Sequence, residues 1–349
     1  MSREAAISLP RKSWAGNTPD KFPDPAPTLG IPFPEVLLLE RAPNEQEAKS
    51  LESHRRSERK GSRMRYLTMD QKPELESPVV ILAFTGWNDA ASAASNAARF
   101  AMRRLGARKF ASIEPEPFFT FTETRPYVRL DSSGERQLTW PGNEFYYART
   151  PSQGPDYVIG IGAEPNLRWR TFTEEYMELF NTLDVSMVVS LGALIGEASH
   201  RRPISVTGSA ADPSLARELN LQRSRYEGPT GILGILHNAL QEAKRPSVSL
   251  WATVPHYITN EQCPPATLAV LQRMQQLLGT SFDLDEIEAA SDGFRDQLET
   301  TLAGDPQLRS YLERLEAALA EEEAEGSLPE ATDLVGDIEQ FLRENSEND

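Results

Sequence analysis

The chain has 349 residues, 52 acidic against 36 basic side chains, a net charge of −16 and one cysteine, Cys263. A single cysteine excludes an internal disulfide and fits a reducing compartment, and the length is sufficient for one large domain with appendages. No apolar run approaches the roughly 18 to 20 residues that a membrane span needs, and nothing near the N-terminus resembles a secretory signal. We therefore expect a cytoplasmic protein without a membrane partner.

The negative charge is concentrated in the C-terminal part of the chain. Residues 283–349 contain 21 Asp and Glu, four Arg and no Lys, which gives this part a net charge of −17 and the rest of the chain +1. Because its net charge is strongly negative, the chain has little long-range attraction for a phosphate backbone. Nucleic acid is therefore not an expected partner. The acidic segment is typical of a solvated helical surface.

Residues 1–75 are expected to form a largely disordered or loosely packed extension, because they are rich in proline and show no sustained hydrophobic periodicity. A basic cluster near the end of this extension could contact nucleic acid or an acidic surface. A solvated basic tail is the alternative. The cluster consists of Arg55, Arg56, Arg59, Lys60, Arg63 and Arg65.

The core domain is predicted over residues 76–281, and it opens with a strand, a tight turn and a helix. Six apolar residues at 79–84 predict a buried strand. Residues 90–105 predict a helix, which Gly106 ends. Asp89 can cap this helix, or it can face a ligand together with Asn88 from the carboxyl edge of a parallel strand, where α/β folds place their sites.

The rest of the core domain alternates strands and helices, which predicts an α/β fold with a mainly parallel sheet. An antiparallel hairpin over residues 118–147 interrupts this alternation; its first part alternates Phe and Thr with the period of a strand, and its turn lies at 131–134. The other predicted strands lie at 109–113, 156–162, 185–191, 204–207 and 247–254, and the helices at 169–183, 212–219, 232–243 and 266–278.

The C-terminal region, residues 282–345, is predicted to be helical and acidic, and residues 346–349 form a tail. Apolar residues recur there at three-to-four spacing, from Phe294 to Leu319. Because such helices need an apolar surface to lie on, we expect them to cover the main domain or a partner subunit.

Five segments of the chain, in order, carry a family pattern. They resemble the actinobacterial branch of the proteasome assembly chaperone 2 family, and the resemblance covers residues 76–345. The segments are Phe84-Thr85-Gly86-Trp87-Asn88-Asp89-Ala90, Glu164-Pro165-Asn166-Leu167-Arg168-Trp169-Arg170, Ser190-Leu191-Gly192-Ala193-Leu194, Arg225-Tyr226-Glu227-Gly228-Pro229-Thr230-Gly231 and Ser249-Leu250-Trp251-Ala252-Thr253-Val254-Pro255-His256-Tyr257.

The resemblance implies a three-layer α/β/α domain similar to the purine nucleoside phosphorylase-like architecture, a helical C-terminal extension and self-assembly as a trimer. Eukaryotic and archaeal relatives are chaperones that bind proteasome α subunits, and they commonly end in a hydrophobic-Tyr-any-residue tail. This chain ends in Asn345-Ser346-Glu347-Asn348-Asp349. That departure argues against docking on the proteasome by this route.

Charged and polar residues follow three of the predicted strands and form a candidate pocket at one edge of the sheet. A Glu and His pair could serve as acid and base, and an Arg could hold an anion. Ion pairs that fix loops or a subunit interface are the alternative, since no nucleophile stands beside a base. The candidates are Asn88, Asp89, Glu164, Asn166, Arg168, Arg170, Glu197 and His200.

Gly228, Thr230 and Gly231 precede a predicted helix and could hold an anion at its free N–H groups; a simple helix entrance is the alternative. The glycines of Gly160-Ile161-Gly162 lack the further glycine of a dinucleotide site. The four histidines and the cysteine show no metal-ligand spacing. We therefore expect no cofactor and no metal.

The leading hypothesis is a non-enzymatic, chaperone-like or scaffold protein that self-associates, with proteasome α subunits as a candidate partner. The alternative is a small-molecule hydrolase or nucleoside-type transferase that uses the charged loops. The predicted hairpin displays more aromatic residues than it can cover, and such residues are enriched at interface cores. The candidate interface residues are Phe118, Phe119, Phe121, Trp140 and Phe145.

Overall fold

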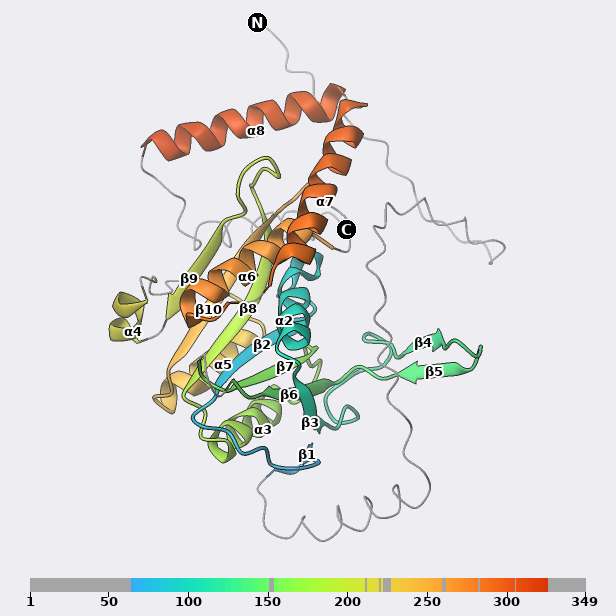
Figure 1. Ribbon diagram of the computed structural model, residues 1–349, viewed down its shortest axis with the longest axis vertical. Coiled ribbons are helices and arrows are strands. Elements are labelled where there is room, and N and C mark those ends of the chain that lie inside the picture. Colours follow the sequence, from blue (N-terminus) through green and yellow to red (C-terminus); the bar gives the residue numbers. More distant parts are fainter. Residues whose placement is uncertain are drawn as a thin grey trace, which may run out of the picture.

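The computed structural model describes residues 64–150, 154–210, 212–219, 221, 227–258, 262–281, 283–304 and 306–325. Most of the predicted N-terminal extension and basic cluster, and the end of the acidic tail, lie outside these residues. An eight-stranded sheet forms the centre of the molecule, in the order β1-β3-β6-β7-β2-β8-β10-β9 (Figure 1). Its strands are β1 (Leu67–Met69), β2 (Val79–Thr85), β3 (Arg108–Ile113), β6 (Asn143–Ala148), β7 (Tyr157–Ala163), β8 (Met187–Gly196), β9 (Val206–Ala210) and β10 (Ser247–Pro255).

Strand β2 lies in the middle of the sheet because its side chains are apolar on both faces. It pairs in parallel with β7 on one side and with β8 on the other, and β8 continues the parallel part to β10. Residues 79–84 are all buried, as is typical of a parallel strand covered on both faces. Antiparallel pairs flank this centre, β6 with β7 and β9 with β10. The predicted α/β class is confirmed, with a sheet that is parallel at its centre and mixed overall.

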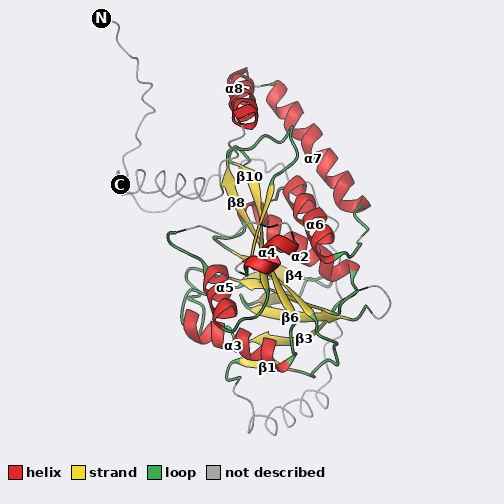
Figure 2. Cartoon of the chain, turned by 90° about the vertical axis from the view of Figure 1, so that its left-hand side faces the viewer, coloured by secondary structure: helices red, strands yellow, loops and turns green. Residues whose placement is uncertain are grey.

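Helices cover both faces of the sheet, which gives three layers (Figure 2). Val79, Ile81 and Ala83 of β2 face one core, shared with α2 (Ala93–Arg104), α6 (Pro264–Leu278) and α7 (Asp285–Ala303). The alternate residues of β2 face a second core with α3 (Trp169–Thr182) and α5 (Ile232–Glu242). The three-layer architecture implied by the family resemblance is therefore confirmed.

Small side chains let α2 approach the sheet closely. Ala94, Ala97 and Ala101 lie one turn apart and are fully buried in the core beside β2 and β8. The helix ends as predicted, because Gly106 has a φ of +60° and the N–H of Ala107 donates to the carbonyl of Met102 at 3.0 Å.

The predicted 118–147 hairpin is only partly correct. Residues 118–122 form turns rather than a strand, with the N–H groups of Phe118 and Phe119 donating to the carbonyl of Pro115. The strands β4 (Tyr127–Leu130) and β5 (Arg136–Thr139) form a separate two-stranded sheet that projects from the body (Figure 1). Strand β6 joins the main sheet instead. A short apolar run is a weak signal for a strand, because side chains on a turn can also reach the core.

Two further boundaries differ from the prediction. Strand β1 pairs with β3 although it precedes the predicted start of the core at residue 76. Strand β8 continues through Gly192 to Gly196, a stretch predicted to be a loop, because β10 pairs with it in register up to Pro255. Gly192 makes room for the indole of Trp251, which a Cβ there would approach to 2.6 Å. This glycine serves close packing within the strand rather than a turn.

The C-terminal region is helical as predicted, over α7 and α8 (Pro306–Glu325). Ile287 and Phe294 of α7 join the core beneath α6, so this helix covers the main domain. Leu302 of α7 packs with Leu312 and Leu315 of α8 in a small separate cluster.

The short helix α4 (Pro213–Glu218) begins as predicted, with Asp212 as its cap. In the part of the chain that the structure describes, no helix has the length and apolarity to cross a bilayer.

Candidate functional site

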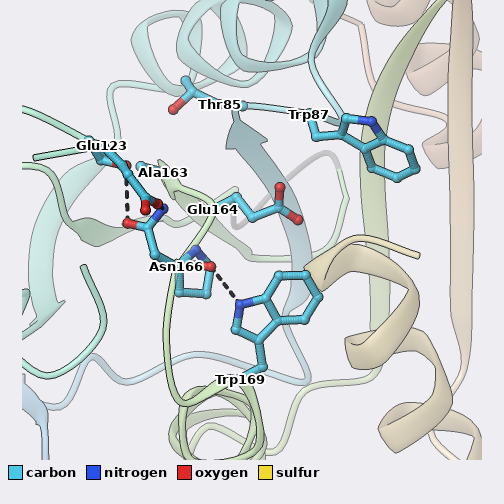
Figure 3. A pocket seen from close by; sticks show the side chains of 10 residues that line it. Thr85, Trp87, Glu123, Ala163, Glu164, Asn166 and Trp169 are labelled. Carbon is cyan, nitrogen blue, oxygen red and sulfur yellow. Dashed lines mark hydrogen bonds between the residues drawn. The ribbon is translucent and has the colours of Figure 1, made fainter. Parts of the chain in front are cut away.

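A pocket of about 470 Å³ opens at the carboxyl ends of β2 and β7 (Figure 3). The two strands are parallel neighbours with Thr85 opposite Ala163, so the loops that follow them meet at one edge of the sheet. The turns between β3 and β4 close the third side. The lining residues are Thr85, Gly86, Trp87, Glu123, Thr124, Ala163, Glu164, Pro165, Asn166 and Trp169.

Glu164 connects three elements at this edge. Its Oε1 accepts hydrogen bonds from Asn88 Nδ2 at 3.2 Å and from the N–H of Ile232 at 2.7 Å. Ile232 is the first residue of α5, where a carboxylate also interacts favourably with the helix dipole. Gly231 is required for this approach, because a Cβ there would lie 2.2 Å from Asn88 Nδ2 and 2.7 Å from Glu164 Oε1. The structure thus brings Asn88, Glu164 and Gly231 together.

Asn166 holds the turns that form the third wall. Its Oδ1 accepts from the N–H of Thr120 at 3.0 Å and from Thr124 Oγ1 at 3.2 Å. Its Nδ2 donates to Glu123 Oε2 at 3.1 Å, and these two side chains lie together in Figure 3. Both ends of the amide are therefore engaged, so Asn166 shapes the pocket rather than offering a free ligand group.

Neither predicted arginine lines the pocket. Arg168 adopts a left-handed φ of +54°, and its Nη1 donates to the Tyr66 hydroxyl at 3.1 Å. Arg170 is exposed one residue beyond Trp169. The predicted anion clamp is consequently not assembled from these side chains.

Asp89 is the cap of helix α2. Its Oδ1 accepts from the N–H groups of Ala94 at 2.9 Å and Ser95 at 3.1 Å, although a 3-10 turn, η1 (Ala90–Ser92), separates it from the first helical residue. Burial raises the pKa of this carboxyl, and the two N–H groups oppose that rise. Of the two alternatives for Asp89, the structure supports the cap.

Neither Glu197 nor His200 lines this pocket, and His200 belongs to a second cluster. His200 is buried, with Nδ1 2.7 Å from the Tyr257 hydroxyl and Nε2 3.1 Å from Glu299 Oε1. Burial lowers the pKa of His200, and the bond to Glu299 opposes this. Arg201 reaches the same carboxylate with Nε at 2.5 Å and Nη2 at 2.9 Å. The cluster ties the loop after β8 to α7, because β8 runs further than predicted and carries this loop away.

The residues before α5 act as a helix entrance. Gly228 and Thr230 are exposed, and Gly231 is the N-cap residue of the helix, without a side-chain cap of its own. Glu164 supplies the missing acceptor from a different loop, as described above. Within the described residues, the predicted anion site is therefore already occupied by a carboxylate of the chain.

A partly buried pair that the sequence did not reveal joins β8 to α5. Ser190 Oγ lies 2.6 Å from His237 Nε2, and His237 Nδ1 lies 3.2 Å from Ser247 Oγ. The distance resembles that of a nucleophile and its base, but Ser190 also donates to Ser249 Oγ at 3.1 Å and is only 1% exposed. Ser190 is thus engaged by a second hydroxyl as well as by the imidazole, and the pair belongs to a packed polar network.

His237 makes the stability of the fold depend on pH. Burial lowers its pKa to about 4, below the 6.5 of an unburied histidine. Well above pH 6.5 the imidazole is neutral in both the folded and the unfolded state, so it has no effect on stability. As the pH falls from 6.5 towards 4, the unfolded chain binds a proton that the folded chain excludes, and the free energy of unfolding decreases, by about 2 kcal/mol.

Urea unfolding of the wild type and of His237→Gln at pH 7 and pH 4.5 measures this effect. The free-energy difference between the two pH values should be smaller in the variant by about 2 kcal/mol. An identical pH dependence in both proteins would assign the titration to other groups.

A family model described as the PAC2 family matches residues 83–302. A PAC2 family protein from Streptomyces avermitilis is 41% identical, with a TM-score of 0.61 over 64% of this chain and 95% of that chain. The Mycobacterium tuberculosis proteasome-assembly chaperone homologue Rv2125 is 37% identical, with a TM-score of 0.61 over 67% of this chain and 99% of its own.

A more distant structure shares the fold alone. Pyrococcus furiosus PbaB, an archaeal proteasome activator, is 17% identical, with a TM-score of 0.55 over 67% of this chain and 97% of that chain. No curated protein matches the sequence.

Proposed function

Because the chain belongs to the PAC2 family, we propose that it is a proteasome-assembly chaperone or scaffold of the cytoplasm, which self-associates as a trimer and binds proteasome α subunits. The observation that carries this proposal is the 37% identity to the M. tuberculosis proteasome-assembly chaperone homologue, which the alignment covers almost completely. The structure adds a surface suited to protein contacts.

That surface is the arm, which we define as residues 125–140 and which contains β4 and β5. In its register Val128 lies opposite Leu138 and Leu130 opposite Arg136, so Val128, Leu130 and Leu138 share one face. They are 41%, 68% and 53% exposed. An isolated two-stranded hairpin is marginally stable, and exposed apolar side chains in such a group mark an interaction site. We infer that another subunit covers this face.

The arm replaces the aromatic interface predicted from the sequence. Phe118, Phe119 and Phe145 are buried in the subunit's own core, where Phe118 meets Phe172 and Phe145 meets Tyr176. These three rings are therefore not available to a partner. Phe121 and Trp140 pack together at the base of the arm, with ring centroids 4.8 Å apart, and Trp140 remains half exposed. Of the predicted set, Trp140 stays an interface candidate.

The geometry gives less support to the enzymatic alternative. The lining of the carboxyl-edge pocket includes no Ser, Cys, His or Lys. In the pair of Ser190 and His237 described above, the serine is buried between β8 and α5 and faces no open cavity among the described residues. Since neither place offers a nucleophile beside a base and an open cavity, the residues that the structure describes favour a binding function.

Co-purification from the native cell tests the proposal. The full chain carries an affinity tag, the cells are crosslinked mildly, and the bound proteins are identified by mass spectrometry. We expect proteasome α subunits to be recovered at least about tenfold above a tag-only control, because a chaperone of micromolar affinity retains its partner through crosslinking. Recovery of no α subunit above that control would count against the proposed partner.

A further inference from the structure

We propose that the carboxyl-edge pocket binds an organic cation, a guanidinium or alkylammonium group. The pocket combines the carboxylate of Glu164 with the indole rings of Trp87 and Trp169, which come from the loop after β2 and the start of α3. In Figure 3 the Glu164 carboxylate points into the space between the two indoles. This inference does not depend on proteasome binding.

One oxygen of Glu164 remains available for a ligand. Oε1 is engaged by Asn88 and the N–H of Ile232, whereas Oε2 makes no hydrogen bond to any residue that the structure describes. The first two bonds fix the carboxylate in place, and Gly231 keeps the space for them. A fixed carboxylate with one uncommitted oxygen is preorganised to accept from an N–H donor.

The two indoles differ in how they are held: Trp169 is fixed by the protein, and Trp87 is largely exposed. Trp169 is held rigidly, because its Nε1 donates to the carbonyl of Pro165 at 2.6 Å and its ring packs against the second core. Trp87 is 55% exposed, although an indole is among the side chains that gain most from burial. A ligand between them would cover the exposed face of Trp87.

The charge of the lining selects the class of ligand. Glu123 and Glu164 are its two charged residues, and neither Lys nor Arg is among the residues that line it. Indole faces attract cations and do not attract carboxylates or phosphates. A cation that reaches Glu164 Oε2 while lying against an indole satisfies both features at once, and the volume of about 470 Å³ is ample for an arginine-sized group.

The cation can belong to a free metabolite or to a side chain of a protein partner, and the probes separate these sources. We would titrate the full chain with methylguanidinium, a free guanidinium, and with acetyl-Gly-Arg-Gly-amide, a guanidinium on a peptide with the same single charge. The same peptide with citrulline is the neutral control. Saturation at a lower concentration of methylguanidinium would identify a free cation, and saturation at a lower concentration of the peptide would identify a side chain.

The readout is fluorine NMR of the chain labelled with 5-fluorotryptophan, which has five signals because there are five tryptophans. Trp87→Phe and Trp169→Phe assign two of them. We expect these two signals to shift with a dissociation constant on the order of 1 mM, and the other three to stay in place. The unmoved signals also show that each variant is folded.

Glu164→Gln is the decisive variant, because its amide oxygen still accepts from Ile232 while the charge is lost. We expect its affinity for the cation to fall at least about tenfold. Glu174→Gln removes an equal charge from the exposed surface of α3 and should bind like the wild type. Three results would each overturn the proposal. They are binding by Glu164→Gln as tight as that of the wild type, signal shifts with the citrulline peptide as large as those with the arginine peptide, and no shift of the Trp87 and Trp169 signals up to about 50 mM cation.

Discussion

Replacing Gly162 by alanine is expected to destabilise the protein by about 3 kcal/mol or more, because no space exists for a methyl group. A Cβ at this position would lie 2.0 Å from Asn143 Oδ1 and 2.4 Å from the backbone oxygen of Gly142. Asn143 is buried opposite Gly162 in the β6–β7 ladder, so it has little freedom to move away. Its Nδ2 donates to the carbonyl of Ala163, and its Oδ1 accepts from the Tyr176 hydroxyl at 3.0 Å.

Urea unfolding measures this loss, and Gly142→Ala is the matched control. Gly142 neighbours the same contact, but a Cβ there meets no atom within 4 Å. We expect the control to change the unfolding free energy by less than about 1 kcal/mol. Similar values for the two variants would show that β6 and β7 separate easily and that the buried Asn143 does not fix their register.

Charges on the apolar face of the arm are expected to convert the proposed oligomer into monomers. Val128→Glu with Leu138→Lys places an ion pair at two opposed positions of the hairpin, so the hairpin itself keeps its pairing. Each lost apolar contact removes about 1.5 to 3 kcal/mol from an interface that buries it. The dissociation constant of the oligomer should therefore rise at least about a hundredfold.

Sedimentation velocity measures the change, and far-UV circular dichroism checks the fold. The matched control is Arg129→Glu with Gln137→Lys, which introduces the same pair on the opposite face of the same hairpin. We expect the control to remain associated. An oligomer that survives the first double substitution, or that dissociates equally in both, would exclude the apolar face of the arm as the subunit contact.

Local patterns were sufficient to predict the main elements of the fold. The continuous apolar run of β2 indicates a central parallel strand, and the alanine face of α2 indicates close helix–sheet packing. Asp212 with Pro213 marks the start of a helix, and Gly106 marks the end of another. In each case the signal and the structure that it specifies lie within a few residues of one another.

The parts that the sequence did not reveal depend on contacts between distant residues. Glu164 caps a helix that begins 68 residues later, and Ser190 meets His237 from 47 residues away. No spacing rule links such positions. The predicted single cleft failed for the same reason, since the full length of β8 is determined by its pairing with β10, and that length carries His200 to the C-terminal helices.

Burial of the aromatic residues was also beyond local inference. Residues 119–122 alternate phenylalanine and threonine like a strand, yet the N–H groups of Phe118 and Phe119 donate to the carbonyl of Pro115 and form a turn. Both phenyl rings enter the core from this turn. Which side chains of the arm share a face depends on its strand register, in which Val128 lies opposite Leu138. The sequence indicated an excess of apolar side chains in this region, and the three-dimensional pairing identified which of them are uncovered.

Direct binding of the purified chain to a purified proteasome α subunit from the same organism tests the central claim. Native mass spectrometry of the mixture, with each protein alone as the reference, reports both the complex and its stoichiometry. The account predicts a complex that contains whole trimers of this chain and one or more α subunits, with a dissociation constant at or below about 1 µM. A spectrum that contains only the two separate proteins, at concentrations up to about 50 µM of each, would contradict it.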